Sequence, residues 1–263
     1  MGRFVPAAEL SRALYVELLA PALHDVPHAA GLLGPGSEVL GYDTERSTDH
    51  DWAPGATVLV EPEDVELVRD RVERILPVTY RGRPTRAGND ALPDRPRVFV
   101  AAVTPWLVGQ LGVDPRTGLG PLDWLCLPQQ LLLHVTAGDV FHDGVGALTS
   151  AREKLAWYPD DVWWWLMACQ WHRISQEEPF PQRTAEVGDA TGSAVMAARL
   201  VRDLMRTALL LARRYAPYAK WLGTAFAQLH HADELPALCG ALGIDLSRLM
   251  LDADQEDRAR LGL

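Results

Sequence analysis

The chain has few cysteines and almost no lysine. Its three cysteines, Cys126, Cys169 and Cys239, are far apart and show no spacing typical of a metal site. Such a scattered, odd-numbered set argues against a disulfide framework, so we expect reduced core thiols and a cytoplasmic protein. Among the 25 basic residues only Lys154 and Lys220 are lysines. This bias indicates a GC-rich genome, and it draws attention to the positions where arginine would not serve.

Long hydrophobic runs and an excess of positive charge are also missing. No apolar stretch reaches the length of a membrane span, and the N-terminus lacks the basic and then apolar pattern of a signal peptide. A formal net charge of −10 argues against a general nucleic-acid-binding surface, although a local basic groove is compatible with it. We therefore expect no membrane partner and no extended nucleic-acid partner. An acidic surface suits a cationic small molecule, and it also serves solubility alone.

Several familiar motifs are absent, namely a Walker-type loop, a Rossmann glycine fingerprint and a Gly-x-Ser-x-Gly elbow. The glycine-rich residues 188–193 precede a long amphipathic pattern, so Asp189 or Thr191 is expected to be a helix N-cap. With 263 residues, 48% of them hydrophobic, the chain is long enough for one large or two ordinary globular domains.

Residues 36–52 combine a Gly-Ser turn with two aspartates one residue apart. Gly36 and Ser37 offer closely approachable backbone, exposed N–H groups and a hydroxyl, which suit a metal-bound triphosphate. If residues 49–52 begin a strand, alternation places the carboxylates of Asp49 and Asp51 on one face. A cation must then lie between them, and Mg²⁺ prefers oxygen ligands of this kind. The alternative interpretation of the aspartates is an acidic surface turn.

This arrangement resembles a known signature. Gly36-Ser37, eleven intervening residues and then Asp49-His50-Asp51 resemble the Gly-Ser…Asp-x-Asp signature of the nucleotidyltransferase superfamily. Gly41 and the Thr48-Asp49 pair also fall where that signature has a glycine and a Ser/Thr-Asp pair. Within the superfamily the layout resembles the kanamycin (aminoglycoside) nucleotidyltransferases. Ser-Thr-Asp-His-Asp-Trp at residues 47–52 and Tyr-Ala-Pro-Tyr-Ala-Lys-Trp at residues 215–221 are similar to an uncharacterised bacterial branch.

The resemblance implies transfer of a nucleoside monophosphate from an NTP, with ATP as the default donor, to a hydroxyl of a small acceptor. Two alternatives stay open, namely a nucleotide-binding protein without catalysis and a transferase that modifies tRNA or protein. The residues that the resemblance assigns to this chemistry are Asp49 and Asp51 as catalytic, metal-binding carboxylates, and Gly36, Ser37, Thr48 and Lys220 as nucleotide contacts.

Two positions leave the assignment incomplete. Lys220 follows Pro217, which can begin a helix, and its ammonium either reaches the triphosphate or lies over Trp221 at the surface. Superfamily enzymes usually carry a third carboxylate on a later strand. The apolar run Val98–Val103 is the strand expected to bear it, and this run contains no acid. Glu61, Asp94 and Asp123, the nearest acids in sequence, are more simply interpreted as loop or helix-cap residues.

The predicted fold is α+β. A small mixed sheet with flanking helices is expected over residues 1–118 and a helical bundle over residues 119–263, with the boundary in the glycine-rich segment 109–120. The resemblance implies an active site in the cleft between the two. Apolar spacing predicts helices over residues 6–23, 61–76, 159–178, 191–214, 217–229, 234–242 and 246–250, and strands near residues 29–33, 58–60 and 97–103.

Three further patterns have competing interpretations. Residues 81–96 are predicted to form a loop, and its arginines, with Arg97, could meet phosphates or RNA or could simply be solvated. The tryptophans of helix 159–178 favour core or interdomain packing over base stacking. On its polar face, Arg173 and Glu177 form either a surface ion pair or a cleft wall, in which Glu177 or Glu178 could be a general base. The remaining set fits no regular metal site, because its spacing is irregular: His134, Asp139, His142 and Asp143.

Overall fold

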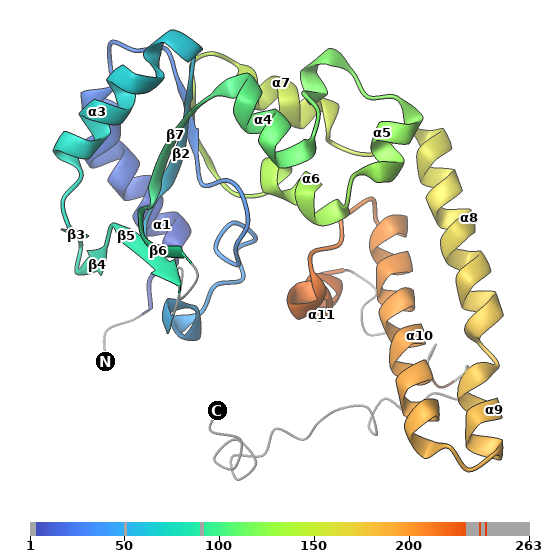
Figure 1. Cartoon of the computed structure of the whole chain (residues 1–263). Coiled ribbons are helices and arrows are strands. Elements are labelled where there is room, and N and C mark those ends of the chain that lie inside the picture. Colours follow the sequence, from blue (N-terminus) through green and yellow to red (C-terminus); the bar gives the residue numbers. More distant parts are fainter. Residues whose placement is uncertain (1–3, 50–51, 90–91, 230–236, 238–239, 241–263) are drawn as a thin grey trace. The chain divides into compact units, whose positions relative to one another are not determined.

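A computed structural model describes residues 4–49, 52–89, 92–229, 237 and 240 of the chain. The fold is α+β, as predicted, with a small mixed sheet and a helical C-terminal region (Figure 1). The chain forms two compact units, Met1–Tyr158 and Pro159–Leu263. The division expected from the sequence lies earlier, at residues 118 and 119. No helix in the described ranges is long and apolar enough to cross a membrane.

The first unit contains the sheet and the helices that flank it. Its elements are α1 (Ala7–Leu14), a π-helical segment (Tyr15–Leu19), α2 (Ala20–Ala22), β1 (Ala29–Gly31), a 3₁₀ turn (Glu45–Asp49), β2 (Ala56–Val60), a 3₁₀ turn (Pro62–Asp64), α3 (Val65–Ile75), β3 (Thr79–Tyr80), β4 (Arg83–Pro84), β5 (Arg86–Asn89), β6 (Leu92–Pro96), β7 (Val98–Ala102), α4 (Val103–Leu111), a 3₁₀ turn (Pro115–Thr117), α5 (Pro121–Cys126), α6 (Gln129–Thr136), β8 (Val140–Asp143) and α7 (Ala147–Lys154).

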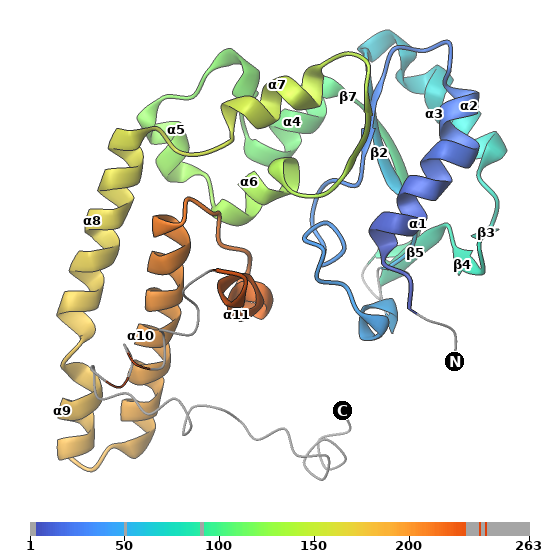
Figure 2. The same cartoon turned by 180° about the vertical axis from the view of Figure 1, so that it is seen from behind.

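The main sheet has the strand order β7-β2-β1-β8. Strand β1 runs antiparallel to β2 and β8, whereas β2 and β7 are parallel, with Ala56 opposite Val98 and Val60 opposite Ala102. Both parallel strands are apolar, as buried strands of this type require. Alternate residues of β2 and β7, including Val58 and Val100, pack into a core with α1, the π-helical segment and α3. Figures 1 and 2 show α1 and α3 on one face of this sheet and α4 on the other.

The loop prediction for residues 81–96 is wrong, because this segment contributes to two short antiparallel hairpins, β3–β4 and β5–β6. Arg81 and Gly82 connect β3 to β4 with φ angles of 50° and 75°. Two successive positive φ angles define the turn that best suits a two-residue hairpin. Arginine rarely takes that conformation. Because the turn has Arg-Gly in place of the usual Asn-Gly or Asp-Gly, the sequence does not indicate this hairpin.

The strand expected to begin at residues 49–52 begins only at Ala56, and Asp49 is instead the last residue of a 3₁₀ turn. Local side-chain hydrogen bonds explain the difference. The Thr48 hydroxyl donates to the Glu45 carbonyl at 2.8 Å, and the Thr44 N–H donates to the Ser47 hydroxyl at 3.0 Å. Such bonds compete with extended backbone. Strand alternation therefore does not position the carboxylate of Asp49, and Asp51 lies outside the described residues.

The second unit is helical and consists of α8 (Asp160–Glu177), α9 (Phe180–Glu186), α10 (Ala190–Leu211) and α11 (Ala219–Ala227). The N-cap prediction for α10 is confirmed at Asp189, whose carboxylate accepts from the Gly192 N–H at 2.7 Å. Figures 1 and 2 show α8 and α10 side by side, with α9 at their junction. A small core of α8, α10 and α11 side chains includes Ile174, Leu200 and Phe226. The predicted helices over residues 234–242 and 246–250 lie almost wholly outside the described residues.

Two predictions of burial are wrong. Cys126 and Cys169 are exposed rather than core thiols, and Cys239 lies outside the described residues. On α8 the indole of Trp163 donates to the Leu210 carbonyl at 2.9 Å and is partly buried. The other three tryptophans of this helix, which the sequence assigns to packing, are mostly exposed: Trp164, Trp165 and Trp171.

Candidate functional site

The Gly-Ser turn follows β1 and has a geometry that only glycine accommodates easily. Gly36 has a φ angle of 132°, and a Cβ at this position would lie 2.4 Å from a carboxylate oxygen of Glu38. The Tyr42 N–H donates to the Ser37 carbonyl at 2.8 Å and closes the turn. The Ser37 hydroxyl forms no hydrogen bond within the described part of the chain. It is therefore available to a ligand.

Arg97 ties this turn to the sheet. Its guanidinium forms a 2.9 Å ion pair with the buried carboxylate of Glu38. Its carbonyl accepts from the Ala56 N–H at 3.0 Å, and its own N–H donates to the Thr85 carbonyl at 2.9 Å. A Cβ on Gly55 would lie 2.3 Å from the Arg97 carbonyl oxygen, so glycine allows this close approach. The Gly-Ser turn and the starts of β2 and β7 therefore meet at one residue.

Trp52 fixes the chain just before β2. Its indole N–H donates to an Asp43 carboxylate oxygen at 2.9 Å, and the same oxygen accepts from the Ala7 N–H at 2.8 Å. The Arg83 guanidinium lies 5.1 Å from the centre of the Trp52 ring. Because Trp52 is buried under these contacts, the end of the predicted signature is anchored to α1 and to the β3–β4 hairpin.

The described residues include only some of the predicted site. Asp51 lies outside them, and for Asp49 they give only the backbone at the end of the 3₁₀ turn. The Thr48 hydroxyl already donates to Glu45, so only its lone pairs remain for a ligand. Lys220 lies in the first turn of α11 in the second unit, and its ammonium is 4.9 Å from the centre of the Trp221 ring. That contact is the surface arrangement considered as the alternative for this lysine.

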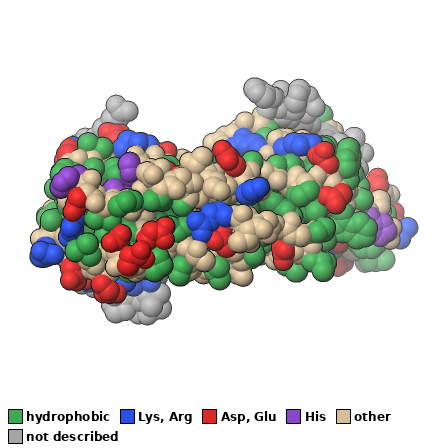
Figure 3. Space-filling view, turned by 90° about the horizontal axis from the view of Figure 1, so that it is seen from above, with side chains coloured by type: hydrophobic (Ala, Val, Ile, Leu, Met, Phe, Trp, Pro, Cys, Tyr) green, Lys and Arg blue, Asp and Glu red, His purple; other side chains and the backbone are tan. Residues whose placement is uncertain are grey.

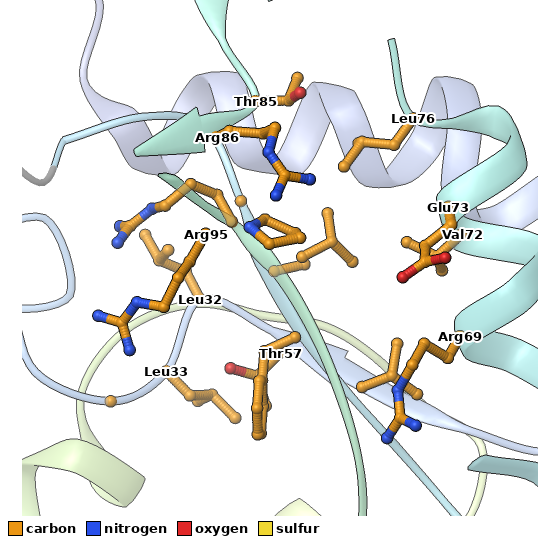
Figure 4. A pocket seen from close by; sticks show the side chains of 18 of the residues that line it. Leu32, Leu33, Thr57, Arg69, Val72, Glu73, Leu76, Thr85, Arg86 and Arg95 are labelled. Atoms are coloured by element: carbon orange, nitrogen blue, oxygen red, sulfur yellow. The ribbon is translucent and has the colours of Figure 1, made fainter. Parts of the chain in front are cut away.

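A cavity of about 880 Å³ borders the edge strand β7 and the residues on either side of the Gly-Ser pair, Pro35 and Glu38. This volume lies within the range of about 300–1,000 Å³ typical of small-molecule sites. Figure 4 shows Arg86 and Arg95 extending toward this space from the β5–β6 hairpin, with Arg69 and Glu73 on the α3 side. The charged residues that line the cavity are Arg69, Arg86, Arg95, Arg97, Glu38 and Glu73.

The cavity has an excess of positive charge within an acidic protein. Two of its cations are neutralised nearby, because Arg97 pairs with Glu38, and Arg69 pairs with Glu66 at 2.5 Å. Arg95 forms no hydrogen bond or ion pair with any residue that the structure describes. Figure 3 shows acidic and basic side chains intermixed on the face that it draws. A local group of guanidinium ions suits a phosphate-bearing ligand.

The sequence pattern of Arg86, Arg95 and Arg97 favours a solvated loop over a phosphate contact, and it assigns no role to Glu38. In the structure these residues line the cavity. Two local signals were present. Glu38 directly follows the Gly-Ser pair, and Arg95 and Arg97 are two residues apart at the start of an apolar strand, where side chains alternate in direction.

The dispersed His and Asp set has separate partners. His134 Nδ1 lies 2.9 Å from Gln110 Oε1, and burial lowers the pKa of His134. Asp139 pairs with Arg12 at 3.0 Å, and Asp143 accepts from the Thr149 N–H at 2.7 Å. No group of three potential metal ligands occurs among the described residues.

Of the two interpretations of Arg173 and Glu177, the ion pair within α8 does not form. Arg173 Nε lies 3.0 Å from the buried carboxylate of Asp203, and Glu177 pairs with Arg199 at 2.5 Å. Both partners are on α10, so the polar face of α8 is used for contact between helices rather than within one helix.

A family model described as a domain of unknown function (DUF4037) matches residues 124–222. The matched segment begins in α5 and ends in α11, so it includes parts of both compact units. It includes Lys220 but neither the Gly-Ser turn nor the two aspartates. No curated protein matches the chain, and no solved structure does.

Proposed function

We propose that this protein is a Mg²⁺-dependent nucleotidyltransferase that moves a nucleoside monophosphate, by default AMP, from an NTP to a hydroxyl of a small acceptor. One observation supports this most directly. The Gly36-Ser37 turn is joined through Glu38 and Arg97 to the starts of β2 and β7, beside an arginine-lined cavity. The segment that carries Asp49 and Asp51 leads into this same end of β2.

In this proposal, residues of the first unit hold the triphosphate and the metal ion. The Ser37 hydroxyl and the N–H groups of its turn would hold the β- and γ-phosphates, which leaves the α-phosphorus accessible. Arg86 and Arg95 would neutralise phosphate oxygens from the cavity wall. Asp49 and Asp51 are oxygen donors of the kind that Mg²⁺ prefers, and the bound ion would offset the charge of the triphosphate.

The proposed reaction is an in-line displacement. The acceptor hydroxyl oxygen forms a bond to the α-phosphorus, the bond from that phosphorus to the bridging oxygen breaks, and pyrophosphate leaves with the electron pair. The hydroxyl proton passes to a base, for which the sequence offers Glu177 or Glu178.

The test measures pyrophosphate release by the purified protein with ATP, Mg²⁺ and a panel of small hydroxyl-bearing acceptors that includes cationic ones. Asp49→Asn and Asp51→Asn should each reduce turnover by at least about a thousandfold, because each removes a carboxylate that holds the metal. Unfolding midpoints should change little. Asp70→Asn, an exposed site on α3, is the matched control and should be fully active. Wild-type turnover by Asp51→Asn would exclude the proposed catalytic assignment.

A second candidate is a nucleotide-binding protein without catalysis. It is favoured by β2 and β7, neither of which carries an acidic residue to complete the metal site. Titration with ATP and Mg²⁺ should show binding under both proposals, whereas pyrophosphate release supports only the enzyme. With two carboxylates alone we expect little Mg²⁺ to bind before the nucleotide, because this ion gives up water reluctantly. A tRNA or protein acceptor is a further option, and the net charge of −10 disfavours tRNA.

A further inference from the structure

Two arginines in the second unit pair with one buried carboxylate, and a third lies one turn away on the same helix. Asp203 of α10 is 1% exposed, and its Oδ1 lies 2.9 Å from Arg202 Nη2 and 3.0 Å from Arg202 Nε. From α8, Arg173 Nε lies 3.0 Å from the other oxygen of the same carboxylate. Gln170 completes the link, since it accepts from Arg173 at 2.5 Å and donates to the Asp203 carbonyl at 3.2 Å. Asp203 therefore holds arginines from two adjacent helices in place.

The third arginine, Arg206, makes no ion pair with a described residue. It lies one turn beyond Asp203 on α10 and forms no hydrogen bond within the described ranges. Partial desolvation lowers the pKa of Arg206, the charges of Arg202 and Arg173 lower it as well, and the charge of Asp203 opposes them, so these three groups lie within electrostatic reach of Arg206. Like charges at short range disfavour the unoccupied arrangement.

The excess of positive charge is confined to Arg173, Arg202 and Arg206, because the neighbouring Arg199 is neutralised. Glu177 and Arg199 neutralise each other one turn away along the same two helices. Within the described part of the chain, the three guanidinium groups share the single negative charge of Asp203, which leaves a net charge of two positive there. The side chains of Arg173 and Arg202 are 42% and 46% exposed, so a solute can reach them while Asp203 lies beneath.

We propose that Arg173, Arg202 and Arg206 form a binding site for a phosphate-type oxyanion that carries at least two negative charges. Guanidinium groups present planar pairs of N–H donors that match the oxygens of such an anion. The buried carboxylate pre-orients two of the three groups, which reduces the entropy lost on binding. The site lies wholly in the second unit and does not depend on nucleotidyl transfer by the first.

The test is titration calorimetry of the full-length protein with inorganic pyrophosphate at low ionic strength, with EDTA present to suppress any metal-dependent binding. The background carries Arg86→Gln and Arg95→Gln, so that the arginines of the first-unit cavity contribute little. Arg206→Gln and Arg202→Gln should each weaken binding about tenfold or more, the usual effect of losing a charged hydrogen bond. Arg206→Gln is the cleaner variant, because Arg206 holds no structural partner and its loss should not reduce stability.

Arg199→Gln is the matched control, since Arg199 is on the same helix and is neutralised by Glu177; its affinity should equal that of the background protein. Equal weakening by Arg199→Gln, or unchanged binding by Arg206→Gln, would overturn the proposal. Parallel titrations with inorganic phosphate and with ATP identify the source of the anion. If binding of pyrophosphate but not of ATP depends on Arg206, the ligand is the free anion, and if binding of both depends on Arg206, the site also accepts the phosphates of an organic molecule.

Discussion

Gly36 holds the Gly-Ser turn in a conformation that a larger residue would strain in two ways. Its φ angle of 132° is unfavourable for L-residues, and a Cβ would meet the Glu38 carboxylate. Gly36→Ala should therefore lower the free energy of unfolding of the first unit by about 2–3 kcal/mol, and it should weaken ATP binding. Urea titration followed by tryptophan fluorescence measures the first effect and calorimetry the second.

Gly41→Ala is the natural comparison for this substitution. Gly41 also has a positive φ angle, 71°, but open space surrounds its Cβ position. Only backbone strain then applies, and we expect a loss of about 1 kcal/mol. Equal losses for the two variants would show that the contact with Glu38 contributes nothing to the geometry of the turn.

The contact of Lys220 with Trp221 can be tested separately from the contact with a triphosphate that the sequence predicts for this lysine. Its ammonium lies over the Trp221 ring, and an exposed cation–π contact of this kind contributes about 0.5–1 kcal/mol to stability. If the ammonium also binds the triphosphate, Lys220→Ala should raise the Kd for ATP about tenfold, and Lys220→Arg should restore stability but not affinity. Unchanged affinity and turnover in Lys220→Ala would leave the ring contact as the whole role of this lysine.

His28, just before β1, and His142 of β8 lie together beside Tyr15 of the π-helical segment. His28 is 4% exposed, its Nε2 lies 2.9 Å from the Tyr15 hydroxyl, and its ring centre is 4.5 Å from that of His142. Burial lowers the pKa of His28, and the charge of His142 lowers it further, against a weaker opposing hydrogen bond to the Val26 carbonyl. The folded first unit therefore keeps His28 neutral at a pH where the unfolded chain is protonated.

This difference gives acid sensitivity with a defined sign. Below the ordinary histidine pKa of 6.5 the unfolded chain binds more protons, so stability is complete above pH 7 and falls as the pH drops toward 5. His28 contributes a slope of at most about 1.4 kcal/mol per pH unit, and His134, whose pKa is also lowered, adds to it. Thermal melts at pH 7.5 and pH 5.5 should show a smaller drop in Tm for His28→Gln than for wild type. An equal drop in both proteins would place the acid sensitivity elsewhere.

Elements with a strong apolar period could be predicted from the sequence, and those stabilised by single polar contacts could not. Helices α3 and α10 follow stripes of apolar residues, and β7 is a continuous apolar run. The β3–β4 hairpin depends on a positive φ angle at Arg81, and an arginine in the sequence does not predict such an angle. The shape of the candidate site depends on the pairing of Glu38 with Arg97 across 59 positions, and no local pattern indicates such a contact.

The division of the whole molecule leads to a prediction about fragments. Strand β8 pairs with β1, and both lie in the unit Met1–Tyr158. A fragment of residues 1–118 would lack β8 and α5 to α7, which leaves β1 with an unpaired edge. We expect residues 1–158 to unfold cooperatively, and residues 1–118 to aggregate or to show no cooperative transition. Circular dichroism melts compare the two fragments. Equal transitions would support the domain boundary that the sequence predicts, at residues 118 and 119.

The pairing of β1 with β8 also has a consequence for synthesis of the chain. The sheet begins with Ala29–Gly31 and is completed by Val140–Asp143, so its last edge stays open while the intervening residues emerge from the ribosome. Contacts of such high sequence separation form slowly, because a long loop must close before they add stability. In the nascent protein the outer edge of β1 therefore stays unpaired until β8 has been synthesised. A chaperone that shields an unpaired strand edge would act during that interval.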